Sequence, residues 1–400
     1  MLRRTFIGLA ASAAAIGLAG TPALAQEDVI KIGASAPKSG PLAGGAAMTH
    51  WPNIQLWMKE VNEAGGLKVG DKQMKLELVE YDDKTNGEEA IKNIQRLATV
   101  DEVDFIVAPY STGLNIAAAP AIARHGYPHI ATTAATDGVN QFAERWPNSF
   151  WMLGTSTQLA NGIVATLAAM KDKGDIGNKV ALVNVADAFG LELVAAAKPA
   201  LDEAGFEIVY ETSYPLGTQD LAPVISQAKA AAPDAFVAFS YPGDTFALTE
   251  QAQVQGFDVP VFYTGVGTAF PPFAARFKEA ANGVMGIGGI NSSDENVKGY
   301  LEMHKAELGS DPDFWASATT YAGLQILGQA IEKAGTLDKA AVVEAIRTNT
   351  FDTVIGEVSM PNNVNEKVWT VGQWNDGVFE AVAAEGLPVA AEPVKKSGWN

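Results

Sequence analysis

The segment Val103–Asn115 reads VDFIVAPYSTGLN and changes character along its length. The apolar run that ends at Ala108 is typical of a buried strand, whereas LNIAAAPAIARH, which follows the polar residues, is typical of a helix. Tyr110, Ser111 and Thr112 therefore stand where a strand ends and a helix begins. In parallel sheets covered by helices, ligands bind at this edge, where helix N-termini also point. The segment predicts both an α/β fold and the position of a binding site.

Short β-rich runs alternate with helical patterns along the rest of the chain. The strands predicted in the first part are 29–34, 74–80, 105–108 and 128–131. The alternation restarts at Phe150, with strands predicted at 179–185, 207–213, 235–239 and 261–263. Near the end, Asn375–Gly377 carries the signal of a β-hairpin turn. Two alternating series predict an α/β protein with two doubly wound, Rossmann-like lobes.

The composition is that of a folded and acidic protein, with 48% hydrophobic residues, 18% charged residues and a net charge of −18. This charge argues against nucleic acids and anionic membrane surfaces as partners. The chain has no cysteine, which excludes disulfides, thiolate nucleophiles and thiolate metal sites. Its stability must therefore come from its apolar core.

Residues 1–25, MLRRTFIGLAASAAAIGLAGTPALA, have the plan of a secretory signal peptide. A basic start at Arg3 and Arg4 precedes an apolar middle and a small-residue site, so we expect cleavage after Ala25. A membrane anchor is the alternative, but the apolar middle is short for that role. RRTFIG also resembles the twin-arginine signal, and a general secretory signal fits equally well. The sequence predicts export without choosing the route.

Two predicted corners offer uncharged hydrogen-bond donors to an anion. After strand 105–108, Ser111 can combine its hydroxyl with the backbone amides that open the next helix. After strand 128–131, the turn ATTAATDG offers the amide of Ala134 and both the hydroxyl and the amide of Thr136. Two such clusters suit one carboxylate, although a role as simple helix caps explains both side chains as well.

Several stretches of the mature sequence carry a resemblance to a known family. In their order along the chain they are IKIGASAPKSGPLAG, EVNEAGGL, LELVEYDDKTN, IATTAATDG, WASATTYAGLQIL and FDTVIGEVSM. Together they resemble the periplasmic leucine/isoleucine/valine-binding family, the type I solute-binding proteins of ABC importers. The resemblance implies a non-enzymatic, monomeric receptor in the periplasm that closes around a small molecule. It also implies a membrane permease as partner, and neither a cofactor nor a metal ion.

The resemblance further implies two lobes joined by three crossovers, near Phe150, Ile287 and Thr353. These positions divide the chain into four parts. The first lobe takes residues 26–149 plus 288–353, and the second lobe takes residues 150–287 plus 354–390. The signal peptide, residues 1–25, is the third part. Residues 391–400 are the fourth part and are expected to form a loose C-terminal tail.

Part of the ligand site also follows from the resemblance. The family holds a ligand carboxylate with a serine and an A-x-T turn, which match Ser111, Ala134 and Thr136. Its amino-acid binders hold the ammonium group with an acidic residue, and Val266 stands at that position here. Because an unpaired buried ammonium costs several kcal/mol, Val266 argues against an α-amino acid unless another acid, such as Asp187, takes over.

The pocket walls are expected to be aromatic. Phe189 and Tyr241 match two aromatic positions of the family, and Trp51 follows a pair of small residues, Gly44 and Gly45, that should open space beside it. With Tyr110, these aromatics would surround an apolar or aromatic ligand body. We therefore expect a small carboxylate that lacks an α-amino group. A branched-chain or other amino acid, or a ligand sensor on the same fold, is the alternative.

Metal and hydrolase sites find less support. His125 and His129 have the spacing of a helical metal pair, but Gly126 and Pro128 break the helix between them. A hydrolase would need a base beside Ser111, and neither a G-x-S-x-G elbow nor a suitably placed histidine surrounds that residue. The sequence thus favours a binding protein over an enzyme.

Overall fold

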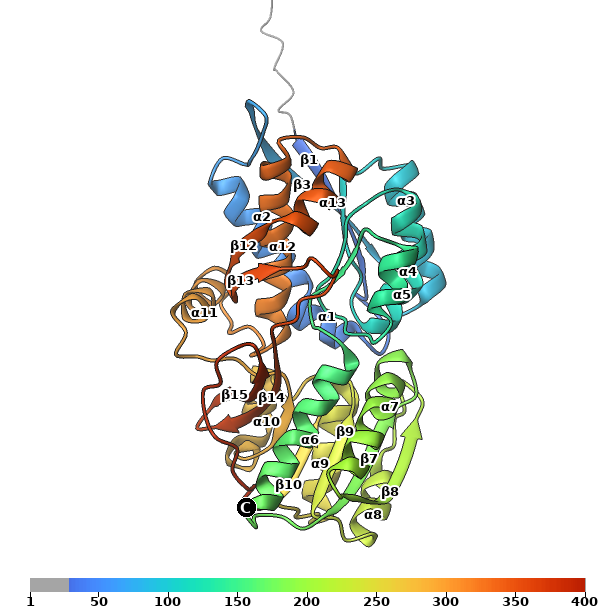
Figure 1. Ribbon diagram of the computed structural model, residues 1–400, viewed down its shortest axis with the longest axis vertical. Helices are drawn as coiled ribbons and strands as arrows, with labels where there is room; N and C mark the ends of the chain where they lie inside the picture. Colours follow the sequence, from blue (N-terminus) through green and yellow to red (C-terminus); the bar gives the residue numbers. More distant parts are fainter. Residues whose placement is uncertain (1–28, 400) are drawn as a thin grey trace, which may run out of the picture.

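The computed structural model describes residues 29–399, which form two lobes stacked along the long axis of the molecule (Figure 1). The predicted signal peptide, residues 1–25, lies outside the described residues. Each lobe has a sheet at its centre and helices around it, which confirms the predicted α/β fold with two doubly wound lobes. None of the helices in this range is both long and apolar enough to cross a membrane.

The first lobe, the upper one in Figure 1, is built around a four-stranded sheet. Its strands are β1 (Val29–Ala36), β2 (Leu67–Val69), β3 (Lys72–Asp82) and β4 (Phe105–Val107), with a separate pair β5 (His129–Ala131) and β6 (Ser149–Trp151) and a hairpin β12 (Thr350–Thr353) and β13 (Gly356–Ser359). The sheet order is β2-β3-β1-β4, in which β1 runs parallel to β3 and β4. The helices of this lobe are α1 (Ala43–Thr49), α2 (Trp51–Glu63), α3 (Gly87–Thr99), α4 (Thr112–Arg124), α5 (Val139–Arg145), α11 (Glu295–Leu308), α12 (Ala316–Ala334) and α13 (Lys339–Thr348).

The second lobe contains a seven-stranded sheet in the order β15-β14-β11-β10-β9-β7-β8. The strands are β7 (Lys179–Val185), β8 (Glu207–Tyr214), β9 (Ala235–Phe239), β10 (Val261–Thr264), β11 (Met285–Ile287), β14 (Val368–Asn375) and β15 (Val378–Glu385). The helices are α6 (Ser156–Asp172), α7 (Ala188–Glu203), α8 (Ala222–Ala230), α9 (Pro242–Val254) and α10 (Pro271–Phe277), followed by a 3₁₀ turn (Lys278–Ala281). Every residue of β9 and β10 is buried, as expected for parallel strands covered on both faces. The predicted hairpin at Asn375–Gly377 joins the antiparallel strands β14 and β15.

The chain passes between the lobes at three places. The first passage follows β6, which still pairs with β5, and the second follows β11, which ends at Ile287. The third passage comes later than the predicted Thr353, because β13 pairs with β12 and Val364 still bridges to Trp151 of the first lobe. Residues 354–359 therefore stay with the first lobe, and not with the second as the sequence analysis expects.

The C-terminal residues do not form the loose tail predicted for 391–400. Lys396 N donates a hydrogen bond to the Pro260 carbonyl at 2.8 Å, and Trp399 Nε1 donates to the Phe257 carbonyl at 2.8 Å. The Trp399 ring packs edge-on against Phe262, with ring centroids 5.0 Å apart, and is only 7% exposed. The large apolar surface of one indole outweighs the small and charged residues around it. The segment up to Trp399 is a strap on the second lobe.

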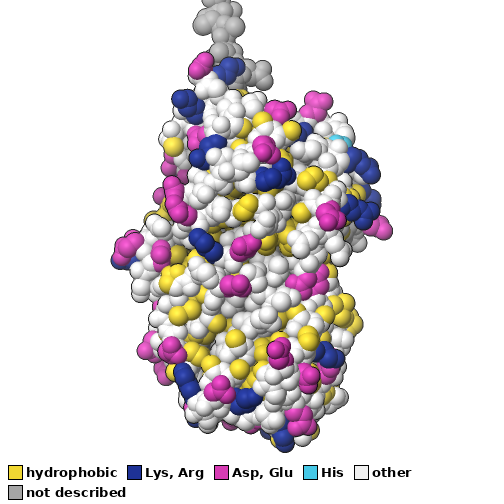
Figure 2. All heavy atoms as spheres, viewed as in Figure 1, with side chains coloured by type: hydrophobic (Ala, Val, Ile, Leu, Met, Phe, Trp, Pro, Cys, Tyr) yellow, Lys and Arg dark blue, Asp and Glu magenta, His cyan; other side chains and the backbone are white. Residues whose placement is uncertain are grey.

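The surface carries charges of both signs and contributes little to stability. On the face shown in Figure 2, acidic side chains are scattered over both lobes, with Lys and Arg side chains among them. Pairs such as Lys198–Glu211 and Arg276–Glu250 are about half exposed, and exposed pairs contribute about 0 to 1 kcal/mol each. The fold is therefore stabilised mainly by its apolar core, since a chain without cysteine cannot form disulfides.

Candidate functional site

Ser111 lies at the corner between β4 and α4, where the sequence places it. Its backbone has φ 77° and ψ 154°, a conformation that glycine adopts readily and other residues almost never adopt. Such a conformation costs about 1 to 3 kcal/mol and persists only where the surrounding structure enforces it. Because backbone strain of this kind concentrates at ligand sites, the corner is the first candidate for one.

The polar groups of this corner are only partly used within the protein. Ser111 Oγ accepts a long hydrogen bond of 3.5 Å from Leu114 N, and Ser111 N donates to Thr133 Oγ1 at 3.2 Å. The amides in the first turn of α4 have no carbonyl partner within the helix, and they give its N-terminus a partial positive charge. Together with the Ser111 hydroxyl, these amides can bind an anion without a basic side chain.

The second lobe faces this corner with residues that directly follow its parallel strands. Phe189 follows β7, Tyr241 follows β9 and Val266 follows β10. All three side chains are buried, and the rings of Phe189 and Tyr241 lie 5.1 Å apart between centroids. The carboxyl ends of parallel strands in the two lobes thus meet at one gap, the usual ligand position in such sheets.

A narrow cavity of about 360 Å³ lies in this gap, and only about 20 Å³ of it admits the centre of a water molecule. Five residues predicted for the site line the cavity, namely Tyr110, Ser111, Phe189, Tyr241 and Val266. Among the described residues, no Lys or Arg lines it. Since so little of the space admits even water, a larger molecule reaches these residues only when the lobes move apart.

The hydroxyl of Tyr241 is the most informative polar group of the cavity. Tyr241 is 3% exposed, and its Oη lies close to Asp187 and Ser111 without completing a hydrogen bond of good geometry to any described residue. Burial, together with the negative charge of Asp187, raises the pKa of Tyr241 well above its usual value, so the hydroxyl keeps its proton. A buried donor without an acceptor costs about 1 to 3 kcal/mol. The second lobe therefore also offers a hydrogen-bond donor to an acceptor group of the ligand.

Ala134 and Thr136, the predicted A-x-T turn, do not line the cavity; Thr133 and Ala135 do. Thr136 Oγ1 donates instead to Glu192 Oε1 at 3.0 Å, and Ala134 packs in an apolar cluster of the first lobe. Adjacent side chains of an extended segment point to opposite sides, so a shift of one residue exchanges the inward and outward sets. The turn lies at the site, but the side chains of Thr133 and Ala135 face the ligand space, and those of Ala134 and Thr136 do not.

Trp51 also lies outside the cavity lining. Its Nε1 donates to the Pro37 carbonyl at 3.2 Å, and the Lys38 ammonium lies 4.7 Å from its ring, so the indole belongs to the first lobe. The small residue Gly45 does not open ligand space as expected, because a Cβ there would lie 2.1 Å from Tyr110 Oη. Gly45 instead lets the Tyr110 side chain, which does line the cavity, pack on α1.

Trp315 and Ala316, at the start of α12, line the cavity and were not predicted. Trp315 lies against the second crossover, where Gly288 has φ 94° and a Cβ would come within 2.0 Å of the indole. Only glycine combines this backbone conformation with the close approach. The sequence has no local signal for this contact, because Gly288 and Trp315 come together only in the folded protein.

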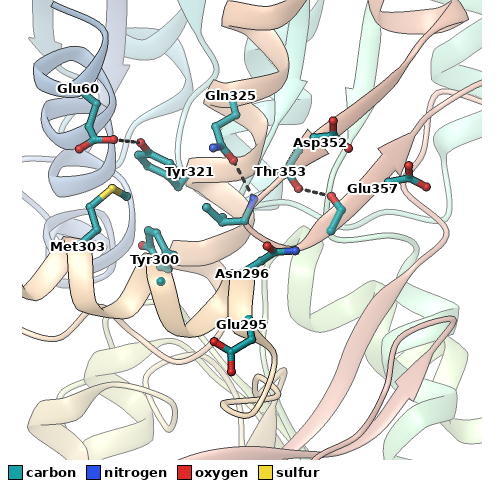
Figure 3. A pocket seen from close by; sticks show the side chains of 13 residues that line it. Glu60, Glu295, Asn296, Tyr300, Met303, Tyr321, Gln325, Asp352, Thr353 and Glu357 are labelled. Atoms are coloured by element: carbon teal, nitrogen blue, oxygen red, sulfur yellow. Dashed lines mark hydrogen bonds between the residues drawn. The ribbon is translucent and has the colours of Figure 1, made fainter. Parts of the chain in front are cut away.

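A second, larger cavity, of about 990 Å³ against about 360 Å³ for the first, lies on the first lobe among α2, α11, α12 and the β12–β13 hairpin (Figure 3). Tyr321 Oη donates to Glu60 at 3.4 Å, and Val354 N donates to Gln325 Oε1 at 2.9 Å. The acidic side chains Glu60, Glu295, Asp352 and Glu357 stand around the rim and do not converge on one point. The cavity between the lobes, with its unpaired donor, is therefore the better candidate.

His50 and His129 belong to the core. Burial lowers the pKa of both His50 and His129 to about 3, so both imidazoles are neutral. His129 lies between Asn115 Oδ1 and Ser149 Oγ, each at 2.9 Å, inside the first lobe. Across residues 29–399, no group of three or more His, Asp or Glu side chains is arranged to hold a metal ion.

A family model described as periplasmic binding protein matches residues 29–378. Leu/Ile/Val-binding protein homolog 7 of Brucella suis is 26% identical, over 96% of this chain and 97% of that protein.

Two similar solved structures have different ligands. A branched-chain amino acid transporter substrate binding protein from Streptococcus pneumoniae, in complex with isoleucine, is 23% identical with a TM-score of 0.76 and covers 92% of this chain and 100% of that one. A solute binding protein of an ABC transporter from Rhodopseudomonas palustris BisB5, in complex with 3,4-dihydroxy benzoic acid, is 22% identical with a TM-score of 0.77 and covers 93% and 99%. The shared fold thus accommodates ligands with and without an amino group.

Proposed function

This chain belongs to the periplasmic binding protein family, and from that premise we propose that it binds a small carboxylate lacking an α-amino group for an ABC importer. One observation carries the choice of ligand. The Tyr241 hydroxyl of the second lobe and the Ser111 corner of the first lobe line the same cavity, and no basic side chain of residues 29–399 lines it. An acid whose oxygens contact both lobes would join them and favour closure.

The donors are sufficient for a useful affinity. Hydrogen bonds to a charged group contribute about 1.5 to 3 kcal/mol each. The Ser111 hydroxyl, an amide of α4 and the Tyr241 hydroxyl provide three such bonds. With about 25 cal/mol per Å² for the buried apolar body of the ligand, the sum reaches the roughly 8 kcal/mol of a micromolar complex before ordering costs.

The walls suit an apolar or aromatic body. Phe189, Tyr241 and Trp315 provide rings, and Val266 occupies the position that carries an acid in the amino-acid binders of the family. A valine cannot pair with an ammonium group, which would be costly to bury alone. Solved proteins of similar fold have been crystallised with benzoate and with 4-hydroxybenzoate, and we propose ligands of this class here.

An amino acid is the second candidate, and Asp187 favours it. Asp187 caps α7 by accepting a hydrogen bond from Gly190 N at 3.0 Å, and its charge acts on the Tyr241 hydroxyl. Burial raises the pKa of Asp187, and a ligand ammonium group nearby would stabilise its ionised form. However, Asp187 does not line the cavity, which is why the plain acid is preferred.

Replacing Asp187 with asparagine separates the two candidates. A plain acid such as benzoate should bind equally well or up to about tenfold more tightly, because a negative charge near the site is removed. Titration calorimetry with benzoate and with phenylalanine provides the measurement. Asp202→Asn, on the exposed end of the same helix, is the control and should change neither affinity. Tighter binding of phenylalanine than of benzoate, lost in Asp187→Asn, would establish the amino-acid receptor instead.

The function itself is tested by recovering the ligand. The purified protein is incubated with a mixture of benzoate, 4-hydroxybenzoate, isoleucine and phenylalanine, and native mass spectrometry identifies what stays bound. Recovery of one unchanged acid supports a receptor, whereas a chemically altered product would require an enzyme. We further propose that the protein acts as a monomer, that it reaches the periplasm through residues 1–25 by either export route, and that a membrane permease receives the acid.

A further inference from the structure

Glu192, on α7 of the second lobe, binds the first lobe at a point outside the ligand cavity. Its Oε1 accepts a hydrogen bond from Thr136 Oγ1 at 3.0 Å, and its Oε2 accepts one from Asp137 N at 2.9 Å. Both donors belong to the turn that precedes α5 of the first lobe. A single carboxylate thus joins the two lobes through two charge-assisted hydrogen bonds, which are about twice as strong as neutral ones.

Ser156 keeps this carboxylate in position. Ser156 is the first residue of α6 in the second lobe, and its Oγ donates to Glu192 Oε2 at 2.8 Å. Thr136 is fully buried, and among the described residues Glu192 forms no ion pair. The carboxylate therefore depends on these neutral donors, two of which belong to the opposite lobe.

The same turn makes a second connection close to the first crossover. Asp137 Oδ1 accepts a hydrogen bond from Thr157 N at 2.8 Å, and Oδ2 accepts one from Thr157 Oγ1 at 3.0 Å. Thr157 lies only a few residues beyond β6, where the chain has just entered the second lobe. Ser156, which binds Glu192, is the neighbour of Thr157, so the two connections between the turn and the second lobe lie side by side near this crossover.

We propose that Glu192 and the Thr136–Asp137 turn form a latch that holds the two lobes closed whether or not a ligand is bound. The latch sets the balance between the open and closed forms of the free protein, and hence the fraction that is ready to hold a ligand. This goes beyond the proposed ligand, because every bond of the latch is made by protein atoms. It also gives Thr136 a role other than the predicted contact with a carboxylate.

The test measures the separation of the lobes without any ligand. Because the chain has no cysteine, Gln95→Cys on α3 and Ser226→Cys on α8 provide two exposed positions for fluorescent labels, one in each lobe. In single-molecule energy transfer, Glu192→Ala should raise the ratio of open to closed molecules by at least about tenfold, because it removes both hydrogen bonds and one charge-assisted bond alone is equivalent to about tenfold. Thr136→Val should act in the same direction.

Matched variants make the result specific. Glu203→Ala removes an exposed carboxylate from the same helix and should leave the energy transfer unchanged. The double variant Thr136→Val with Glu192→Ala should open the protein no further than Glu192→Ala alone, because both changes break the same connection. Thermal melting of each variant checks that the lobes are folded, and Glu192→Gln, which keeps the side-chain volume, should open the protein to a smaller extent.

Unchanged energy transfer in Glu192→Ala would overturn the latch. So would a Thr136→Val variant that binds benzoate more weakly while its lobes stay as closed as in the parent, since Thr136 would then contact the ligand directly. The first result does not depend on the ligand proposal being right, because it is measured on the free protein. A protein that binds none of the tested acids can still open when Glu192 is removed.

Discussion

Replacing Ser111 with glycine is expected to weaken binding of the preferred acid by ten- to a hundredfold without lowering the melting temperature. The loss corresponds to one hydrogen bond to a charged group, about 1.5 to 3 kcal/mol. Stability should not suffer, because glycine adopts φ 77° and ψ 154° without strain. The cap bond to Leu114 N that disappears is long, at 3.5 Å, and serine-to-glycine changes at caps cost only a few tenths of a kcal/mol.

This combination distinguishes a ligand contact from a helix cap. If Ser111 served only to start α4, the glycine variant would bind as well as the parent protein. Titration calorimetry with the acid that gives the largest thermal shift provides the affinity, and thermal melting without ligand provides the stability. Thr155→Gly is a matched control, because Thr155 caps α6 by accepting a hydrogen bond from Gln158 N at 3.1 Å and does not line the cavity. It should lower stability slightly and leave affinity intact.

Replacing Trp399 with alanine is expected to lower the free energy of unfolding of the second lobe by about 3 to 5 kcal/mol. The change removes the edge-on packing against Phe262 and the hydrogen bond to the Phe257 carbonyl, and it leaves a cavity in the core. It also frees the strap that Lys396 N pins to the Pro260 carbonyl. Urea unfolding followed by circular dichroism gives the measurement.

The control for this change lies just before the strap. Val389 is 45% exposed, and Val389→Ala should change the free energy of unfolding by no more than about 0.5 kcal/mol. Because the lobes can unfold separately, tryptophan fluorescence should be followed as well, so that an early transition of the second lobe is seen as such. Equal urea midpoints for Trp399→Ala and the parent protein would show that the strap does not contribute to the stability of the second lobe.

The strands were predictable because buried parallel strands are apolar along their whole length. β7 and β9 have the predicted bounds, Lys179–Val185 and Ala235–Phe239, and each apolar run is set off by polar or turn residues. The helices α1 and α2 were not predicted. Their first turns hold the glycines and the proline of GGAAMTHWP, which weaken a helical pattern, and packing of α2 against α12 outweighs that weakness.

The site was predictable only in part. The strand-to-helix corner identifies Ser111, because the edge of a sheet at which ligands bind follows from topology, whereas Tyr241 and Val266 come from the family resemblance. A one-residue shift separates the predicted Ala134 and Thr136 from Thr133 and Ala135, which line the cavity, and the residue pattern of the turn does not distinguish the two sets. Trp315 lies far from the other lining residues in sequence, and only the folded chain brings it to them.

The sheet of the second lobe contains strands that come before α11, α12 and α13 in the sequence and strands that come after them. β11 pairs with β14, and the intervening residues 288–367 belong mostly to the first lobe. In a nascent chain that ends before Val368, the edge of β11 that pairs with β14 therefore has no partner strand. Unpaired strand edges of this kind can pair with other chains and lead to aggregation. The second sheet cannot be completed before its last two strands, β14 and β15, are synthesised, so this lobe can finish folding only when the far end of the polypeptide is available.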